Sequence, residues 1–404
     1  MKKTVKITSI VFLICIMTVS GIITPGPTVS GCVEQPQTAA YAEWRESKGQ
    51  SYLYIFANTY QELGFLEGFH LASQILALQA ITEGLAYQMG LPYEYFVGMA
   101  LQYEPFIPEQ YRLEIQAISE GVNAYLEDIG APTDYSYAKS LTGNVFFDIF
   151  YGVLLPLSAG EHVVYPPLGC TTIGALNRFL FWTNPTIAQN VDLGPGMEHV
   201  LAWVLTEMPG KPRIFTLRGG PVICTSIGKS DHVSVCSNFL FSTVYGFPNI
   251  PYGVRSRMLF ESSTTAREAI EFLPQTFSMH YTLSDNTELY TVEVSPIHLS
   301  VHEVDNIVVR ANMFVDEMQY DMDPNDSVMR IARALKLLEE YWKDYKVIQF
   351  IRNKNILRIL GDPGIARYSP QDMYPTAAFF LAYPGGGQFG MGTTNNSPHG
   401  KVPI

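Results

Sequence analysis

The sequence lacks any cluster of lysine and arginine beyond its first few residues. Its 38 acidic residues outnumber its 26 basic ones over 404 residues, which gives a net charge of −12. Clustered cations supply most of the affinity for a phosphate backbone, so nucleic acid is not an expected partner. No serine lies in a Gly-x-Ser-x-Gly turn, no lysine completes a phosphate-binding glycine loop, and no internal repeat is present. The α/β-hydrolase, P-loop and repeat classes are therefore not expected.

Cysteine is scarce, with five residues in the whole chain. Cys15 and Cys32 belong to the N-terminal segment, which leaves Cys170, Cys224 and Cys236 for the folded body. An odd number is a poor disulfide framework for an exported protein and indicates a free thiol. Cys224 and Cys236 either pair or lie buried in strands, and Cys170 is the cysteine left over.

The N-terminus has the layout of a secretory signal. Three lysines within the first six residues precede an uncharged run over residues 7–24. That run is also about the minimum length for a membrane-spanning anchor. Small residues at 29–31 precede Cys32, as at a lipoprotein processing site, so Cys32 is a candidate for lipidation. We expect an exported, extracytoplasmic protein that contacts the membrane only through its N-terminus, with free secretion and retention inside as alternatives.

Composition and periodicity divide the chain into three sections. Residues 33–43 show no periodic pattern, so residues 1–43 are assigned to the export signal and a tether. Residues 58–89 place apolar side chains at three- and four-residue spacing, which predicts one long helix, and residues 109–130 predict a second. Gly64 and Gly68 lie four apart and permit close approach of a neighbouring element. Section 44–169 is therefore expected to be mostly helical.

Section 170–404 has the character of a strand-rich body. Short runs of β-branched and aromatic residues alternate there with Gly, Pro, Asn and Asp. Helices are predicted over 264–273 and 327–342, and the two sections are expected to form one α+β domain. The predicted strands occupy 199–208, 213–219, 221–228, 232–243, 276–285, 287–296 and 306–314.

Two further patterns resemble binding motifs but lack the context that such motifs require. Gly385, Gly387 and Gly390 match G-x-G-x-x-G, yet only 14 residues follow Gly390, too few for the helix and strand of a dinucleotide site. A turn between two terminal strands is predicted instead. His298 and His302 are four apart in a strand-like segment, where this spacing does not align metal ligands as it does on a helix. Neither a metal nor a cofactor is expected.

Cys170 lies in the sequence Gly-Cys-Thr-Thr, where the helical section gives way to the strand-rich one. A free cysteine in a core behaves as a small hydrophobic residue, and that interpretation stays open here. Gly169 before it can adopt backbone angles that other residues avoid. If the Gly169–Cys170 peptide bond were cleaved, one residue would carry both a thiol and an α-amine. The pKa of an α-amine is about 8, so the nucleophile would then carry its own base.

Six segments together resemble one family. They are "ELGFLEGFHLASQI", with a G-x-x-x-G helix; "GCTT", at a processing site; "AQNVD" over 188–192, similar to a G-Q-N-x-D strand; "HVSVCSNFLF"; "VVRANMF", similar to T-N-H-F; and "SVMR", similar to S-x-x-R. From about residue 58 to 385 the chain resembles the acyl-coenzyme A:6-aminopenicillanate acyltransferase-like peptidases. These are N-terminal-nucleophile hydrolases related to the bile-salt and acid-amide hydrolases.

The resemblance implies a fold, an activity and a set of site residues. The fold is a four-layer αββα sandwich, and the activity is hydrolysis of a small acyl-amide substrate after autocleavage between Gly169 and Cys170. No cofactor is implied, and the two fragments of the chain stay associated. The implied roles are Cys170 as nucleophile, Asp192 holding the released amine, Asn238 in the oxyanion hole, and Asn312 and Arg330 positioning the amine or the processed terminus.

The sequence departs from the family at three positions. Ala188 replaces the glycine before Gln-Asn, Val191 replaces an aromatic residue, and Met313 replaces the histidine of T-N-H-F. The spacing from Cys170 to Asp192 is also longer, as if residues 177–185 contained an insertion. These departures bear on substrate preference and on the rate of processing, and they leave the nucleophile in place.

Alternative interpretations remain for the function and for single residues. An amine instead of water could capture the thioester, which would make the protein an acyltransferase, or an unprocessed chain could be an inactive binding lipoprotein. Without the resemblance, Asn238 and Asn312 suit turns or caps at strand ends. Asp192 suits a solvated turn, and Arg330 suits a surface ion pair.

Overall fold

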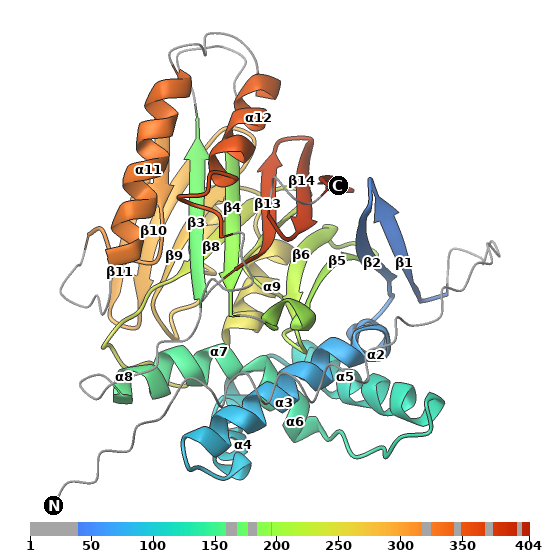
Figure 1. Cartoon of the computed structure of the whole chain (residues 1–404). Coiled ribbons are helices and arrows are strands. Elements are labelled where there is room, and N and C mark those ends of the chain that lie inside the picture. Colours follow the sequence, from blue (N-terminus) through green and yellow to red (C-terminus); the bar gives the residue numbers. More distant parts are fainter. Residues whose placement is uncertain are drawn as a thin grey trace, which may run out of the picture.

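The computed structural model describes residues 39–158, 168–176, 184–194, 196–316, 325–342, 349–367, 375–393 and 398–404. Within these ranges the chain is a mixed α+β structure built around two β-sheets (Figure 1). The expected export signal and Cys32 lie outside the described residues, as does most of the insertion expected over 177–185. The α+β class predicted from the sequence is confirmed.

The two sheets are antiparallel throughout except where β2 pairs with β5. In spatial order, the nine-stranded sheet contains β1 (Tyr41–Ser47), β2 (Gln50–Phe56), β5 (Leu201–Glu207), β6 (Ile214–Gly219), β7 (Gly228–Ser230), β8 (Ser234–Phe239), β9 (Met279–Ser284), β10 (Leu289–Ser295) and β11 (His298–Glu303). The six-stranded sheet contains β12 (Ile307–Arg310), β3 (Leu168–Ala175), β4 (Thr186–Leu193), β13 (Thr376–Tyr383), β14 (Gly386–Met391) and β15 (Gly400–Lys401).

Most of the helices lie before β3 or after β8 in the chain. The first group is α2 (Tyr60–His70), α3 (Ala72–Gln88), α4 (Tyr93–Leu101), η1 (Glu104–Phe106), α5 (Glu109–Asp128), α6 (Tyr137–Asn144), α7 (Phe146–Ile149), η2 (Phe150–Leu154) and α8 (Leu155–Ser158). The later helices are η3 (Met197–Val200), α9 (Tyr252–Ser262), α10 (Ala266–Ile270), α11 (Asn325–Trp342) and α12 (Gln349–Leu360). No single helix in the described ranges has the length and hydropathy of a membrane span; the bent pair of α6 and residues 146–157 has them only jointly.

Both faces of the six-stranded sheet are buried. On one face, Ile173 and Phe379 pack with Leu337 of α11 and with residues of α12. On the other face, Phe380 shares a core with Phe215 of the nine-stranded sheet. Figure 1 shows α11 and α12 together on the same side of β3 and β4. Because successive residues of a strand point to opposite faces, each residue of β3 is directed either to the helices or to the space between the sheets.

Helices α2 and α5 cover the other face of the nine-stranded sheet, opposite the core that it shares with the six-stranded sheet. Leu53 of β2 and Val204 of β5 pack there with Leu63 of α2 and Ile115 of α5. Apolar contacts of this kind stabilise the fold because they remove hydrocarbon surface from water. The helical section therefore belongs to the same core as the strands that follow Cys170.

The predicted close approach at Gly64 and Gly68 is confirmed. A Cβ on Gly64 would lie 2.1 Å from the Glu114 carbonyl oxygen of α5, and one on Gly68 would lie 2.2 Å from that of Ile118. The helix predicted over 109–130 is also confirmed, and Gly130 has the positive φ of 69° that ends it. Because glycine has no Cβ, Gly64 and Gly68 allow the backbones of α2 and α5 to approach each other closely.

The prediction of one long helix over 58–89 is wrong, because the helix is interrupted at Leu71. α2 is held against α5 by its glycines, whereas Leu78 of α3 packs with Phe146 and Val200. The chain changes direction at Leu71, where φ is −106° and ψ is 15°, so that both apolar faces are buried. Periodicity reports each face but not the angle between them.

Two predictions at strand positions are also wrong. Residues 41–43, expected in the tether, belong to β1, which pairs with β2 through a two-residue turn at Lys48 and Gly49 with positive φ at both. Residues 221–227, expected as a strand, have no strand pairing. The N–H of Ile223 donates to Asn144 Oδ1 at 3.0 Å, and its carbonyl accepts from Arg257 Nη2 at 2.8 Å, so side chains satisfy the backbone that a ladder would otherwise use.

Candidate active site

Cys170 lies in β3 between β12 and β4, opposite Val191. The thiol of Cys170 belongs to the core between the sheets. Burial, together with the nearby carboxylate of Asp192, raises the pKa of Cys170 to about 12 against the opposing effects of Gln189 and Arg330. The thiol is therefore protonated at neutral pH, and it requires a base before it can act as a nucleophile.

Asn312 holds the backbone nitrogen of Cys170. That N–H donates to Asn312 Oδ1 at 2.6 Å, while Asn312 Nδ2 donates to the Phe239 carbonyl at 2.9 Å. The backbone N–H of Asn312 donates to Ser327 Oγ at 3.2 Å. The amide is thus fixed with its oxygen toward Cys170. The nitrogen that would become the α-amine is already hydrogen-bonded in the uncleaved chain.

Arg330 is buried beneath the same residue, on α11. Each of its five N–H groups has an acceptor, which fixes the guanidinium in one orientation. The acceptors are Cys170 O at 2.5 Å, Thr171 Oγ1 at 2.8 Å, Asn312 Oδ1 at 3.0 Å, Ser327 Oγ at 3.3 Å and Asp326 Oδ2 at 3.1 Å. Arg330 therefore positions the backbone of Cys170 and the amide that holds it.

Asp192 lies opposite Gly169 in β4, next to the bond that cleavage would break. Its Oδ1 accepts from Thr376 Oγ1 at 2.6 Å, and its Oδ2 lies 3.9 Å from Arg367 Nε. That Oδ2 accepts no hydrogen bond from any described residue. Burial raises the pKa of Asp192 to about 6, although Arg330, Thr376 and Arg367 favour its charged form. A buried carboxylate with one oxygen that accepts no hydrogen bond can receive an ammonium group.

Gly169 gives Asp192 its place beside the backbone. A Cβ at position 169 would lie 3.1 Å from Asp192 Oδ2 and 3.3 Å from its Cβ, closer than ordinary van der Waals contact. Val191, next to Asp192 in β4, directs its side chain to the core between the sheets, as Cys170 does. Because successive strand residues point to opposite faces, the carboxylate of Asp192 lies on the face opposite the Cys170 thiol. The carboxylate thus borders the backbone at the Gly169–Cys170 bond, not the sulfur.

We expect Gly169→Ala to slow any cleavage at this bond. The added methyl displaces the Asp192 side chain, and about 1.4 kcal/mol of strain corresponds to a rate about tenfold lower. A time course of freshly synthesised protein on a denaturing gel measures the rate. Gly98→Ala in α4 is the matched control, because a Cβ there meets nothing within 4 Å. Cleavage of the Gly169→Ala chain at the wild-type rate would contradict this account.

Asn238 provides an amide N–H donor on the same face of β3 as the Cys170 thiol. Its Oδ1 accepts from Thr172 Oγ1 at 2.7 Å, and Thr172 shares a face of β3 with Cys170 because the two are two residues apart. Asn238 Nδ2 is buried and donates to none of the described residues. Ser237 N donates to Gln189 Oε1 at 3.0 Å and joins this strand to β4. An oriented amide N–H of this kind stabilises a negatively charged oxygen.

The structure brings all five predicted site residues to one region. Asn312 and Arg330 contact Cys170 directly, Asp192 lies across from Gly169, and Asn238 connects through Thr172. Asp192 and Arg330 are buried, so a solvated turn and a surface ion pair do not describe them. Five further residues of the site were not predicted as such: Gln189, Asp326, Ser327, Arg367 and Thr376. Only Gln189 and Ser327 lie within the motifs quoted above.

Two other cysteines and two histidines were also considered in the sequence. Cys224 and Cys236 are free and buried, so the alternative that they pair is wrong. His298 and His302 lie in β11. Gly385 lies in the turn between β13 and β14, as predicted, and Gly387 and Gly390 belong to β14.

The site can perform acyl transfer once a base is available. It combines a buried thiol, a held backbone nitrogen, a carboxylate and an unpaired amide donor. Cleavage of the Gly169–Cys170 bond would supply a base, the α-amine, on the same residue as the thiol. Searches against protein-family models and against curated proteins find no match for the chain.

Proposed function

We propose that the chain is an exported, autoprocessing N-terminal-cysteine hydrolase that cleaves a linear amide. One observation carries the proposal. The Cys170 nitrogen donates to Asn312 Oδ1 at 2.6 Å, beside Arg330 and the buried Asp192, so the atom that would become an α-amine sits in a site suited to hold one. A core position that needed only a small apolar side chain would not require these polar partners.

We further propose that the fold is the αββα sandwich of the N-terminal-nucleophile hydrolases. Two facing sheets that share a core, with α11 and α12 on one outer side and α2 and α5 on the other, support this assignment. Cys170 in β3 then lies in the strand that carries the nucleophile in such enzymes.

The proposed cleavage is an N-to-S acyl shift followed by hydrolysis. The Cys170 sulfur adds to the Gly169 carbonyl carbon, the C–N bond breaks, and the nitrogen takes the thiol proton. Water then attacks the thioester, its hydroxyl stays on Gly169 as a carboxyl group, and its other hydrogen returns to the sulfur. The products are a carboxyl terminus at residue 169 and a free amine on Cys170.

In the proposed turnover, that amine replaces an external base. The neutral α-amine takes the thiol proton, and the thiolate adds to the substrate amide carbon. Asn238 Nδ2 donates to the oxyanion, and the ammonium returns its proton to the leaving amine. Water, deprotonated by the same amine, then hydrolyses the thioester and releases the acid. Asp192 favours the ammonium form, and Asn312 and Arg330 keep Cys170 in place.

Trapping of the acyl-enzyme tests this function. A panel of acyl amides of 7-amino-4-methylcoumarin, with short to medium acyl chains, should release the fluorescent amine with wild-type protein. Added hydroxylamine should divert the thioester to a hydroxamic acid. Cys170→Ala should lose both products, whereas Cys224→Ala, which removes another buried free thiol, should keep them. Amine release that survives in Cys170→Ala would overturn the assignment, and acyl transfer that greatly exceeds hydrolysis would identify an acyltransferase.

A further inference from the structure

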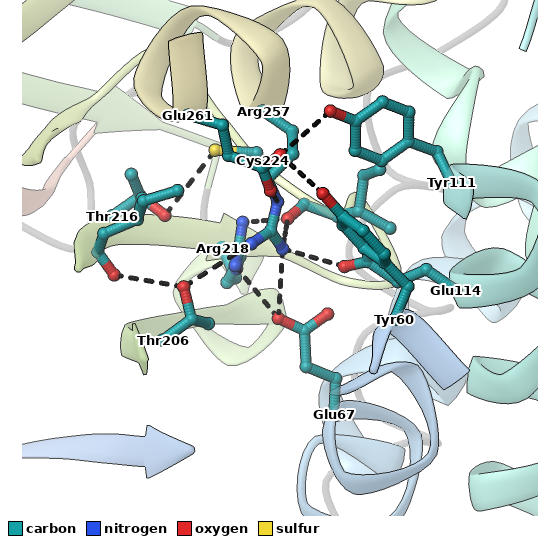
Figure 2. Close-up of polar contacts among 12 residues, drawn as sticks. Tyr60, Glu67, Tyr111, Glu114, Thr206, Thr216, Arg218, Cys224, Arg257 and Glu261 are labelled. Atoms are coloured by element: carbon teal, nitrogen blue, oxygen red, sulfur yellow. Dashed lines mark hydrogen bonds and ion pairs between the residues drawn. The ribbon is translucent and has the colours of Figure 1, made fainter. Parts of the chain in front are cut away.

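A buried cluster of charged residues that includes none of the predicted site residues lies between α2, α5, β6 and α9 (Figure 2). Arg218 Nη2 lies 2.9 Å from Glu67 Oε1, and Arg257 Nη2 lies 2.8 Å from Glu114 Oε1. All four side chains are at most 4% exposed. Charges removed from water to this extent require partners, so the four residues depend on one another.

A third carboxylate extends the cluster toward the surface. Glu261 Oε1 lies 3.9 Å from Arg257 Nε, and Glu261 Oε2 accepts hydrogen bonds from Tyr60 OH at 2.6 Å and Tyr111 OH at 3.0 Å. Figure 2 shows both tyrosine hydroxyls directed at this carboxylate. Lys211 Nζ, which is partly exposed, lies 3.5 Å from the same oxygen.

The members of the cluster come from both sides of the Gly169–Cys170 bond in the sequence. Glu67 and Glu114 precede the Gly169–Cys170 bond, as do both tyrosines, whereas Arg218, Arg257 and Glu261 follow it. Each arginine therefore takes its closest carboxylate from the section before residue 170. The same division applies to Asp148 of α7, whose Oδ1 accepts from Tyr252 N at 2.9 Å and from Thr276 Oγ1 at 2.5 Å.

We propose that this cluster is the interaction surface that locks the 39–169 fragment to the 170–404 fragment after cleavage. The inference rests on the proposed autocleavage, because an uncleaved chain needs no such lock. The fit is one of charge: the first fragment supplies carboxylates to two buried guanidinium groups of the second. The partner of the 170–404 fragment is therefore the 39–169 fragment of the same chain.

The lock makes the two fragments depend on each other. Without the first fragment, Arg218 and Arg257 would lose Glu67 and Glu114, and an unpaired buried cation strongly destabilises a fold. The backbone carbonyl of Ile223 accepts from both arginines, so the segment after β6 depends on the same charges. It follows that the chain folds as a whole before it is cleaved.

Cutting, with an added protease, a variant that cannot cleave itself tests the lock independently of autocleavage. In Cys170→Ala protein, a protease recognition sequence inserted after residue 163 allows the full chain to be cut after it has folded. Analytical ultracentrifugation over a dilution series then gives the concentration at which the fragments separate. Glu67→Gln should raise that concentration by about a hundredfold or more, since loss of one partner of a buried pair has an effect of this size.

Two further variants complete the test. Asp231→Asn removes a carboxylate that pairs with Arg213 within the second fragment, and it should leave the separation concentration unchanged. Glu67→Met combined with Arg218→Met replaces the pair by apolar side chains of similar size. This double variant should restore association, and it provides a test even if Glu67→Gln alone does not fold. Equally tight association in Glu67→Gln and the parent, or no recovery in the double variant, would overturn the proposal.

Discussion

Purified wild-type protein should contain a fragment that begins at Cys170 and ends at Ile404, and Cys170→Ala should remain one chain. The expected difference is complete, because the shift requires a side-chain nucleophile that can add to the Gly169 carbonyl, and alanine has none. The N-terminal cysteine of the fragment should condense with an aldehyde to a thiazolidine, with loss of one water. Intact mass spectrometry before and after aldehyde treatment measures both features.

Folding controls make that result interpretable. Cys170→Ala replaces one small buried side chain by another, so its circular dichroism spectrum and its melting behaviour should match those of a folded protein. Cys170→Ser should be cleaved more slowly, because a hydroxyl can make the same shift but is a weaker nucleophile. A folded wild-type chain that stays intact before residue 170 would contradict the proposal and favour a binding protein.

The parts of the fold that the sequence predicted correctly have local signals. The helix over 109–130 combines apolar periodicity with Gly130, and the turn near residue 385 has consecutive glycines. Gly64 and Gly68 indicated a close neighbour because their spacing places both on one side of a helix. The identity of that neighbour, α5, depends on contacts between residues far apart in the chain, which periodicity does not report.

The parts that the sequence did not predict involve buried polar residues. α9 has the sequence "YGVRSRMLFES", in which Ser256 and Arg257 occupy the buried face. Such residues normally mark the solvent side, so the apolar period of this helix is hidden. They are buried because carboxylates from α2 and α5 neutralise Arg257. A pattern of hydrophobic residues does not reveal a core built partly from ion pairs.

The residues of the candidate site also divide into those that the sequence predicted and those that it did not. Cys170, Asn312 and Arg330 could be selected because each lies in a short motif. Thr376, which donates to Asp192 from 184 residues away, lies in no such motif. Asp326 was also missed, although its carboxylate accepts from the Nε–H of Arg330, since an acidic residue in the first turn of a helix commonly only complements the helix dipole. Contacts across strands and between segments assemble the site.

Asp192→Asn should lower turnover by on the order of a hundredfold or more, the usual scale for a group that supports acid–base catalysis. The substitution keeps the shape of the side chain, and the amide oxygen can still accept from Thr376. It removes the negative charge that favours the Cys170 ammonium. Asp231→Asn, at a partly exposed ion pair with Arg213, is the matched control and should retain wild-type turnover.

The pH dependence separates this role from a purely structural one. In the uncleaved chain the pKa of Asp192 is raised from 3.8 to about 6, mainly by burial. A raised folded-state pKa means that the protonated carboxyl fits the fold better than the carboxylate. The contribution to stability is therefore present at low pH and is lost as the pH rises from about 4 through 6. In the Cys170→Ala background, Asp192→Asn should gain stability relative to its parent over that window, by about 3 kcal/mol at most.

Cleavage should move the titration of Asp192 downward. The new ammonium on Cys170 is an opposite charge next to the carboxylate, and an opposite charge lowers the pKa of an acid. Turnover by the processed enzyme should fall below about pH 8 as the Cys170 amine is protonated, and fall further below about pH 6 as Asp192 is protonated. Asp192→Asn should lack this second, acidic limb. The measurements are pH–rate profiles of processed protein and denaturant unfolding of the uncleaved chain at pH 4, 6 and 8. Wild-type turnover in Asp192→Asn, with its acidic limb unchanged, would remove Asp192 from the mechanism while leaving Cys170 in place as the nucleophile.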